Sequence, residues 1–92
     1  MGKYYYVYVL RSEKDGKFYV GYTNNVQKRL ELHNSGQVES TKRRVPLELI
    51  YWEGCINQQD ATKREKYLKS SWGKRYIKNR LEQYLSVVHP VR

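Results

Sequence analysis

The sequence predicts a small α+β domain in which a three-stranded antiparallel sheet is flanked by helices, in the order β-β-α-β-α-α. Two segments rich in Tyr and Val, 4–10 and 18–22, flank a polar turn that ends in Asp15-Gly16, which indicates a β-hairpin. A third segment, 47–54, has the two-residue alternation of a strand. Helical patterns lie between the hairpin and this third strand and again after it.

The hairpin brings several tyrosines onto one face of the sheet. Because side chains alternate along a strand, Tyr4, Tyr6 and Tyr8 point to the same side. The length of the turn predicts that Tyr8 pairs with Tyr19, which places these two rings on a shared face. In this register Tyr6 lies opposite Gly21, where the missing side chain leaves room for a bulky ring or a ligand.

Capping residues and glycines set the expected bounds of the helices. Thr23 or Asn24 can cap a first helix that reaches about Asn34. The C-terminal part of the chain predicts two further helices, 60–72 and 74–85, separated at Gly73.

Composition predicts one basic domain, residues 1–92, acting on an anionic partner. The 92 residues include 18 Lys and Arg against 9 Asp and Glu, a net charge of +9, and the isoelectric point of about 9.7 is typical of nucleic-acid binders. General solubility or weak affinity for polyanions is the alternative. Cys55 is the single cysteine, which fits a reducing compartment such as the cytoplasm. The sequence predicts neither a signal peptide nor a membrane span.

Arg29 and His33 are spaced i,i+4 and therefore share a helix face beside its apolar stripe. Arg29 can bind a phosphate and offset charge in a transition state, or it can be an ordinary surface arginine. His33 can transfer a proton near neutral pH, or it can be a helix-end histidine favoured by the dipole. Tyr8 and Tyr19, on their shared face, could act as bases only if a nearby cation stabilised the phenolate, because the pKa of a free tyrosine is about 10.

Glu65 lies on the apolar side of its helix. Ala61, Leu68 and Trp72 form the predicted inward stripe, and Glu65 lies on that stripe. A carboxylate on a buried face needs compensation. The compensating group can be a divalent cation such as Mg²⁺ or Mn²⁺, or an ion pair with Arg29 or a nearby lysine. Helical periodicity alone favours neither.

A dense group of basic residues predicts a surface for the nucleic-acid backbone. Between Lys63 and Arg80 the chain has eight basic residues and a single acidic one, Glu65. Such phosphate contacts position nucleic acid without reading its sequence, and a solvated helical face is the alternative. The residues predicted to bind nucleic acid are Lys42, Arg43, Arg44, Lys63, Lys66, Lys69, Lys74, Arg75 and Lys78.

The chain resembles the GIY-YIG nuclease superfamily over nearly its whole length, and most closely its small stand-alone members. The positions that carry this resemblance are Tyr6-Val7-Tyr8, Tyr19-Val20-Gly21, Arg29, His33 and Glu65. The resemblance implies three antiparallel strands flanked by helices, and hydrolysis of one DNA strand with a single Mg²⁺ or Mn²⁺ ion.

The resemblance also implies roles for the matched residues. Tyr8 or Tyr19 would help to deprotonate the attacking water, and His33 would assist proton transfer or orient a tyrosine. Arg29 would stabilise the pentavalent phosphate, and Glu65 would hold the metal ion.

Two further positions bear on the resemblance. Asn79 is the candidate for a late polar residue that many members carry near the site. The first triplet begins with Tyr6 in place of glycine.

Members of the superfamily usually take specificity from an attached DNA-binding domain, for which this chain has no room. Specificity is therefore expected to come from DNA shape or a partner protein, or to be low.

The expected function is a cytoplasmic, metal-dependent endonuclease that nicks DNA with low sequence specificity, in DNA repair or recombination. One alternative is a non-catalytic nucleic-acid-binding module on the same scaffold. A second is a protein-interaction domain whose basic surface binds an acidic partner. Salt-sensitive retention on DNA would distinguish this last alternative from the others.

Overall fold

The computed structural model describes residues 3–88, and within this range it has three strands and four helices. In chain order they are β1 (Tyr5–Ser12), β2 (Phe18–Thr23), α1 (Val26–Asn34), β3 (Leu47–Cys55), α2 (Gln58–Lys69), α3 (Ser71–Arg80) and α4 (Glu82–Val88). The strands form one antiparallel sheet in the order β2-β1-β3. The predicted α+β fold is confirmed, with the last expected helix divided at Leu81 into α3 and α4. No helix in the described range is long and apolar enough to cross a membrane.

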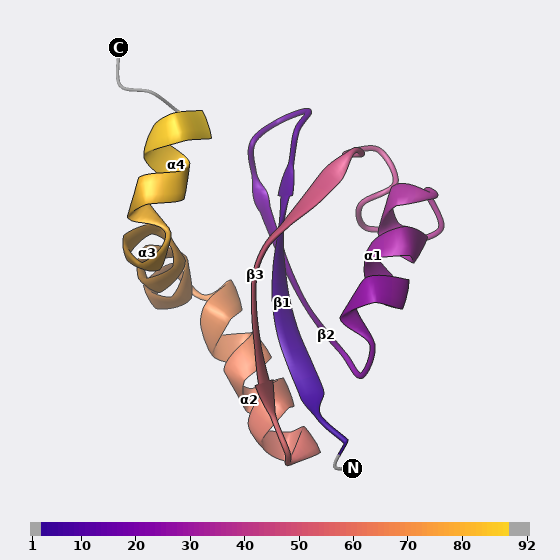
Figure 1. Ribbon diagram of the computed structural model, residues 1–92, viewed down its shortest axis with the longest axis vertical. Helices are drawn as coiled ribbons and strands as arrows, with labels where there is room; N and C mark the ends of the chain where they lie inside the picture. Colours follow the sequence, from indigo (N-terminus) through magenta and orange to yellow (C-terminus); the bar gives the residue numbers. More distant parts are fainter. Residues whose placement is uncertain (1–2, 89–92) are drawn as a thin grey trace.

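Helices cover both faces of the sheet, with α1 on one side and α2, α3 and α4 on the other (Figure 1). The alternation of β1 separates two parts of the core. One part packs β1 and β2 against α2 and α3; its buried residues are Val7, Val9, Val20, Ala61, Leu68 and Ile77. The other part lies toward α1 and β3; its buried residues are Tyr8, Leu10 and Leu47. Tyr8 therefore lies on the face that α1 covers.

The register of the hairpin differs from the expected one by two residues. Tyr8 lies opposite Gly21, and Leu10 lies opposite Tyr19. The predicted pairings of Tyr8 with Tyr19 and of Tyr6 with Gly21 are therefore wrong. The space left by the glycine is taken by the ring of Tyr8.

The length of the turn explains the shift. β1 continues to Ser12, whose backbone N–H donates to the carbonyl of Lys17 at 2.9 Å, so that residues 13–16 make the reversal. A shift by an even number of residues leaves each side chain on the face it had. Tyr8 and Tyr19 consequently still share a face, as predicted, with ring centroids 6.3 Å apart.

The junction of α2 and α3 also differs from the sequence prediction. The expected continuation of the helix to Trp72 is wrong, because α2 ends at Lys69 and Ser70 caps both helices. Gly73 does not stop a helix. It lies inside α3, where a Cβ atom would overlap the backbone of Leu68, so glycine permits the close approach of α3 to α2. Because the chain turns at Ser70, Trp72 is 64% exposed and lies outside the core.

The start of α1 is one residue later than expected. Asn25 is the N-cap, and its side chain accepts from the Lys28 N–H at 3.0 Å. Thr23 ends β2 instead, and its hydroxyl accepts from the Asn25 N–H at 3.1 Å. The prediction that Thr23 or Asn24 caps this helix is wrong, because the Thr23 side chain orders the connection that precedes it.

The loop between α1 and β3, residues 35–46, is attached at its ends. The Asn34 side chain accepts from the Leu47 N–H at 2.7 Å and donates to its carbonyl at 2.9 Å. Gly36 follows α1 with φ +78°, a left-handed conformation that favours glycine. The loop carries Thr41 into the interior, where it is fully buried.

Candidate active site

The site forms where the Tyr8 side chain crosses β2. Tyr8 is buried, and a Cβ atom at Gly21 would overlap its hydroxyl oxygen. Glycine at this position therefore lets a tyrosine from the central strand extend to the edge strand. The glycine of Tyr19-Val20-Gly21 thus has a physical role, since only a residue without a side chain leaves this passage open.

Four side chains, from Arg29 through Tyr8 and His33 to Thr41, form one hydrogen-bonded chain. Arg29 Nε donates to Tyr8 Oη at 3.4 Å, and Tyr8 Oη lies 2.9 Å from His33 Nε2. His33 Nδ1 lies 2.7 Å from Thr41 Oγ1. Because Arg29 can only donate, the Tyr8 hydroxyl proton finds its acceptor in Nε2, and this assigns the ring proton to Nδ1, which donates to Thr41.

Sequence reasoning missed Thr41. It lies in an irregular loop, so helical or strand periodicity carries no signal for it. Its hydroxyl nevertheless contacts the second nitrogen of a histidine that is itself completely buried. The partner of one histidine nitrogen determines which form the other nitrogen takes, so Thr41 belongs to the site.

Burial keeps both titrating groups of this chain uncharged at neutral pH. The pKa of His33 falls from 6.5 to about 4, first because of burial and second because of the charge on Arg29. Burial also raises the pKa of Tyr8, while the hydrogen bond from Arg29 acts in the opposite direction. A neutral phenol therefore donates to a neutral imidazole, an arrangement that can pass a proton from one to the other.

Tyr19 completes the group at the edge strand. Its ring lies edge to face with His33 at 4.9 Å between centroids, and it is partly exposed. The pKa of Arg29 is raised, chiefly by its hydrogen bond to Tyr8 and further by Tyr19. The structure thus brings together the four residues that sequence spacing singled out: Tyr8, Tyr19, Arg29 and His33.

Glu65 approaches this group from α2. Its side chain is 20% exposed and forms an ion pair with Lys69, with 3.0 Å between Oε2 and Nζ. Its negative charge is also one of the causes that raise the pKa of Tyr8. The ion pair with a nearby lysine, one of the two interpretations of this carboxylate, is therefore present, and the carboxylate also acts on the site.

Glu65, the carboxylate nearest in kind to a metal ligand at this site, is compatible with a magnesium-type ion. Within residues 3–88 no cluster of three His, Cys, Asp or Glu side chains is arranged to hold a metal. Mg²⁺ commonly keeps several waters and binds through one or two carboxylates together with substrate phosphates. Glu65 is a single half-buried carboxylate, which fits that mode and does not fit a site built wholly from protein ligands.

Basic side chains continue from Tyr19 along the same edge. A depression of about 210 Å³ is lined by Tyr19, Lys69 and Lys74 among others. A second depression continues from Lys74 to Lys78 and Lys17. We call these four lysines, Lys17, Lys69, Lys74 and Lys78, the basic ridge.

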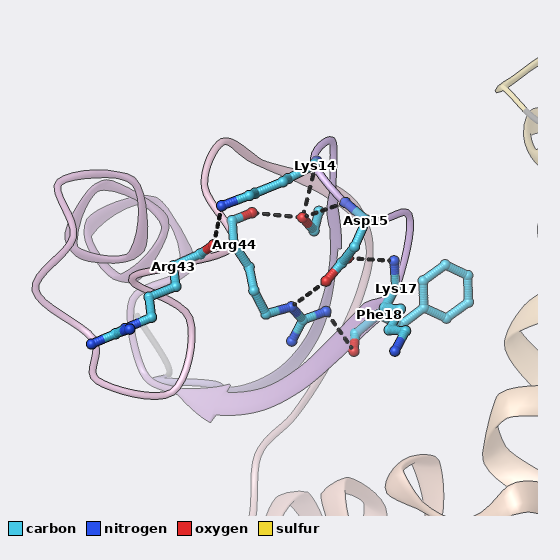
Figure 2. Close-up of polar contacts among 7 residues, drawn as sticks. Lys14, Asp15, Lys17, Phe18, Arg43 and Arg44 are labelled. Atoms are coloured by element: carbon cyan, nitrogen blue, oxygen red, sulfur yellow. Dashed lines mark hydrogen bonds and ion pairs between the residues drawn. The ribbon is translucent and has the colours of Figure 1, made fainter.

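The basic loop is partly used to build the fold. The Arg44 guanidinium pairs with Asp15 at 3.2 Å and donates to the Phe18 carbonyl at 3.4 Å. Its own carbonyl accepts from the Ser12 hydroxyl at 2.6 Å. Figure 2 shows the Arg43 side chain pointing away from these contacts. Arg44 therefore fastens the loop to the hairpin turn, and Arg43 extends outward.

The other predicted binding residues lie at the surface. Lys42 forms an ion pair with Glu39 at 3.1 Å. Asn79 is exposed on α3, in a depression that it shares with Lys78 and other basic residues. It therefore lies with the basic face of α3. The remaining exposed members on α2 and α3 are Lys63, Lys66 and Arg75.

Comparison with known proteins places this site in a family. Residues 4–81 match the family described as the GIY-YIG catalytic domain. The chain belongs to the GIY-YIG family. Domains of this family are nuclease-type, and GIY-YIG nucleases generally use divalent metals.

Similar proteins are named UPF0213. One from Streptococcus pneumoniae (serotype 4, strain TIGR4) is 42% identical over 65 residues, which cover 70% of this GIY-YIG chain and 65% of the relative. The chain thus spans just under two-thirds of that relative. One from Clostridium perfringens (strain 13) is 43% identical over 70% of this chain and 69% of its own length. A solution structure of a UPF0213 protein from Bacillus halodurans is 30% identical, with a TM-score of 0.47, and covers 91% of this chain and 84% of that chain.

Proposed function

We propose that this GIY-YIG domain is a divalent-metal-dependent endonuclease that nicks one DNA strand with little sequence specificity. The observation that carries the proposal is the hydrogen-bonded chain from Arg29 through Tyr8 to His33, at the edge strand and beside a half-buried Glu65. Metal-assisted phosphodiester hydrolysis requires a cation for the phosphate, a route for a proton and a carboxylate for a metal. The site supplies residues of each kind.

Proton movement follows from the electrostatics of the site. Tyr8 Oη can take a proton from the attacking water while it passes its own proton to His33 Nε2. The charge of Arg29 is one cause of the low pKa of His33. A bound phosphate offsets that charge, so substrate binding raises the pKa of His33 and makes it a better acceptor. As the phosphorus–oxygen bond to the leaving group breaks, Arg29 stabilises the charge on the phosphate.

Glu65 would hold the metal ion, Mg²⁺ or Mn²⁺. When bound, such an ion neutralises charge on the leaving oxygen. Lys69 neutralises Glu65 in this structure, and its side chain is 54% exposed. It can therefore turn outward toward a phosphate of the substrate when the carboxylate takes up a cation.

The basic ridge would bind the DNA backbone next to the site. Its lysines follow Tyr19 along one edge of the molecule and contact phosphates without reading bases. The proposal therefore includes low sequence specificity, with selection by DNA shape or by a partner protein. It also includes a role in DNA repair or recombination and a cytoplasmic location.

Nicking of supercoiled plasmid with Mg²⁺ or Mn²⁺ tests the proposal. We expect the wild type to convert plasmid to the open circle, and EDTA or Glu65→Gln to abolish conversion. Glu39→Gln is the matched control, because it removes an exposed carboxylate whose ion pair with Lys42 lies in the loop. A wild type that retards plasmid without nicking it, and leaves branched and single-stranded DNA intact, would support the binding-module alternative instead.

A further inference from the structure

Large aromatic side chains are exposed next to the site, on the same face of the sheet as Tyr8. Trp52 is 55% exposed and Tyr4 is 46% exposed. Tyr6 lies between them, with its ring centroid 5.5 Å from that of Trp52 and 6.4 Å from that of Tyr4. We call Tyr4, Tyr6 and Trp52 the aromatic patch. It lies beside the start of α1.

The sheet is shaped to present these rings. Tyr6 lies opposite Gly54 on β3, and a Cβ atom at Gly54 would come within 3.0 Å of the Tyr6 ring. Such a contact is tighter than a side chain normally tolerates, so glycine lets the Tyr6 ring lie across β3 beside Trp52. Exposing an indole in water gives up the burial that would stabilise the fold. The three rings also lie together on one face, and contiguous exposed apolar surface marks a binding site, whereas a single exposed ring does not.

A depression of about 450 Å³ lies beside the patch, which is within the roughly 300–1,000 Å³ of small-molecule sites. Tyr6 and Trp52 line one side of it, and Asn24, Asn25 and Gln27 at the start of α1 line the other. Amide side chains both donate and accept hydrogen bonds. No carboxylate is among the lining residues. Flat apolar rings facing amides are the groups that recognise a nucleobase, by stacking and through its polar edge.

We propose that the aromatic patch is a stacking subsite for an unpaired base of the strand that is cut. This inference rests on the proposed function. Trp52 pairs with Tyr8 across β1 and β3, so the patch and the site lie on the same face of the sheet. The segment 21–24 leads directly from the Gly21 passage to the depression. A strand whose phosphate lies against Arg29 can therefore place a neighbouring base on Tyr6 and Trp52.

Self-association through the patch is the competing explanation. The net charge of +9 on this small chain opposes bringing two copies together. Polar amides also take up one side of the depression, whereas the centre of a stable homodimer interface is more apolar than the rest of the surface. These observations favour the nucleic acid, and the test below includes the other outcome.

Binding in EDTA tests the subsite without any cleavage. The probes are a labelled single-stranded oligothymidylate, an abasic strand of the same length and a duplex. Stacking on an aromatic ring adds about 5- to 150-fold in affinity per base. We expect Trp52→Ala to weaken binding of the oligothymidylate by a factor in this range and to leave the abasic strand unaffected. Tyr67→Ala is the matched control, because the Tyr67 ring is similarly exposed, at 43%, but lies on α2.

Fluorescence of Trp52 gives a direct second readout. The chain has two tryptophans, so Trp72→Phe leaves Trp52 as the only indole. We expect the oligothymidylate to quench its emission and the abasic strand to leave it unchanged. Trp52→Tyr should retain part of the affinity that Trp52→Ala loses, because a ring able to stack remains.

Three results would overturn the inference. The first is equal affinity for base-bearing and abasic strands, and the second is an equal loss from Trp52→Ala and Tyr67→Ala. The third is a change in Trp52 emission with protein concentration alone, together with a dimer in size-exclusion chromatography with light scattering. The binding test is done in EDTA and does not depend on cleavage. Plasmid nicking can therefore fail while binding confirms the subsite. Absence of binding to all three probes at low salt would overturn both proposals.

Discussion

Thr41→Val isolates the buried end of the proton route. The substitution keeps the shape of the side chain and removes the hydroxyl that contacts His33 Nδ1 at 2.7 Å. Both residues are completely buried, so water cannot replace the lost partner. A buried polar group left without a hydrogen bond costs about 1–3 kcal/mol. We therefore expect the free energy of unfolding to fall by about 1–3 kcal/mol.

The effect on proton transfer is larger than the effect on stability. Without Thr41 the ring proton is no longer held on Nδ1, and the form protonated on Nε2 cannot accept from Tyr8. At metal sites, removing the partner that orients a histidine typically costs 10–100-fold in activity. Thr41 orients His33 in the same way, although His33 is not assigned to the metal. We expect a loss of about this size in plasmid nicking. Thr41→Ser, which keeps the hydroxyl, should restore most of it.

Nitrogen-15 NMR of the histidine ring separates positioning from general destabilisation. The wild type should show His33 neutral at pH 7 with its proton on Nδ1, and Thr41→Val should shift the population toward Nε2. Urea denaturation of the same samples gives the stability change. Retention of the Nδ1 proton and full nicking in Thr41→Val would refute the reasoning, as would a serine variant as impaired as the valine variant. The NMR result stands apart from whether the chain cuts DNA.

Three further predictions follow from the same contacts. In the folded chain the pKa of His33 is about 4, against 6.5 for an unperturbed histidine. As pH falls from 6.5 to 4, the unfolded chain therefore binds more protons than the folded chain. Urea denaturation across pH should therefore show about 3 kcal/mol of stability lost between pH 6.5 and 4, and His33→Gln should lack this slope. Gly21→Ala places a Cβ on the Tyr8 hydroxyl. This overlap should lower the free energy of unfolding by about 1–3 kcal/mol in urea denaturation. It should also displace the hydroxyl from the site, so that nicking is lost while the circular dichroism spectrum is unchanged. Gly73→Ala pushes α3 away from α2 and should lower stability by about 1–3 kcal/mol in thermal melts.

Each of these has a result that contradicts it. A pH slope that survives in His33→Gln would assign the acid sensitivity to other groups. Full nicking by Gly21→Ala would show that the Tyr8 hydroxyl is not needed at the edge strand. Gly73 lies in a helix interior, where alanine is ordinarily favoured by about 1 kcal/mol over glycine. A stabilised Gly73→Ala would therefore mean that the close approach of α3 is relaxed in solution. Ser71→Ala, in the same turn and exposed, is the control.

Local patterns were sufficient to predict most of the elements. The Tyr and Val alternation of β1 and the Asp15-Gly16 turn predicted the hairpin, because strand pairing of neighbouring segments depends on nearby residues. The i,i+4 spacing of Arg29 and His33 likewise predicted that they share a face. The register was wrong because β1 extends to Ser12, whose hydroxyl is held by the carbonyl of Arg44 from a distant loop. Contacts of that kind are not visible in a hairpin sequence.

The sequence by itself determined the basic charge, the set of Tyr, Arg, His and Glu side chains, and the face on which each one lies. Only the tertiary structure decided how these groups meet. Packing of the loop 35–46 buries His33 against Thr41, and the turn at Ser70 leaves Trp72 exposed. Periodicity is a property of one element and is set by neighbouring residues. Burial, pKa and hydrogen-bond partners depend on segments far apart in the chain, which come together only when the domain folds.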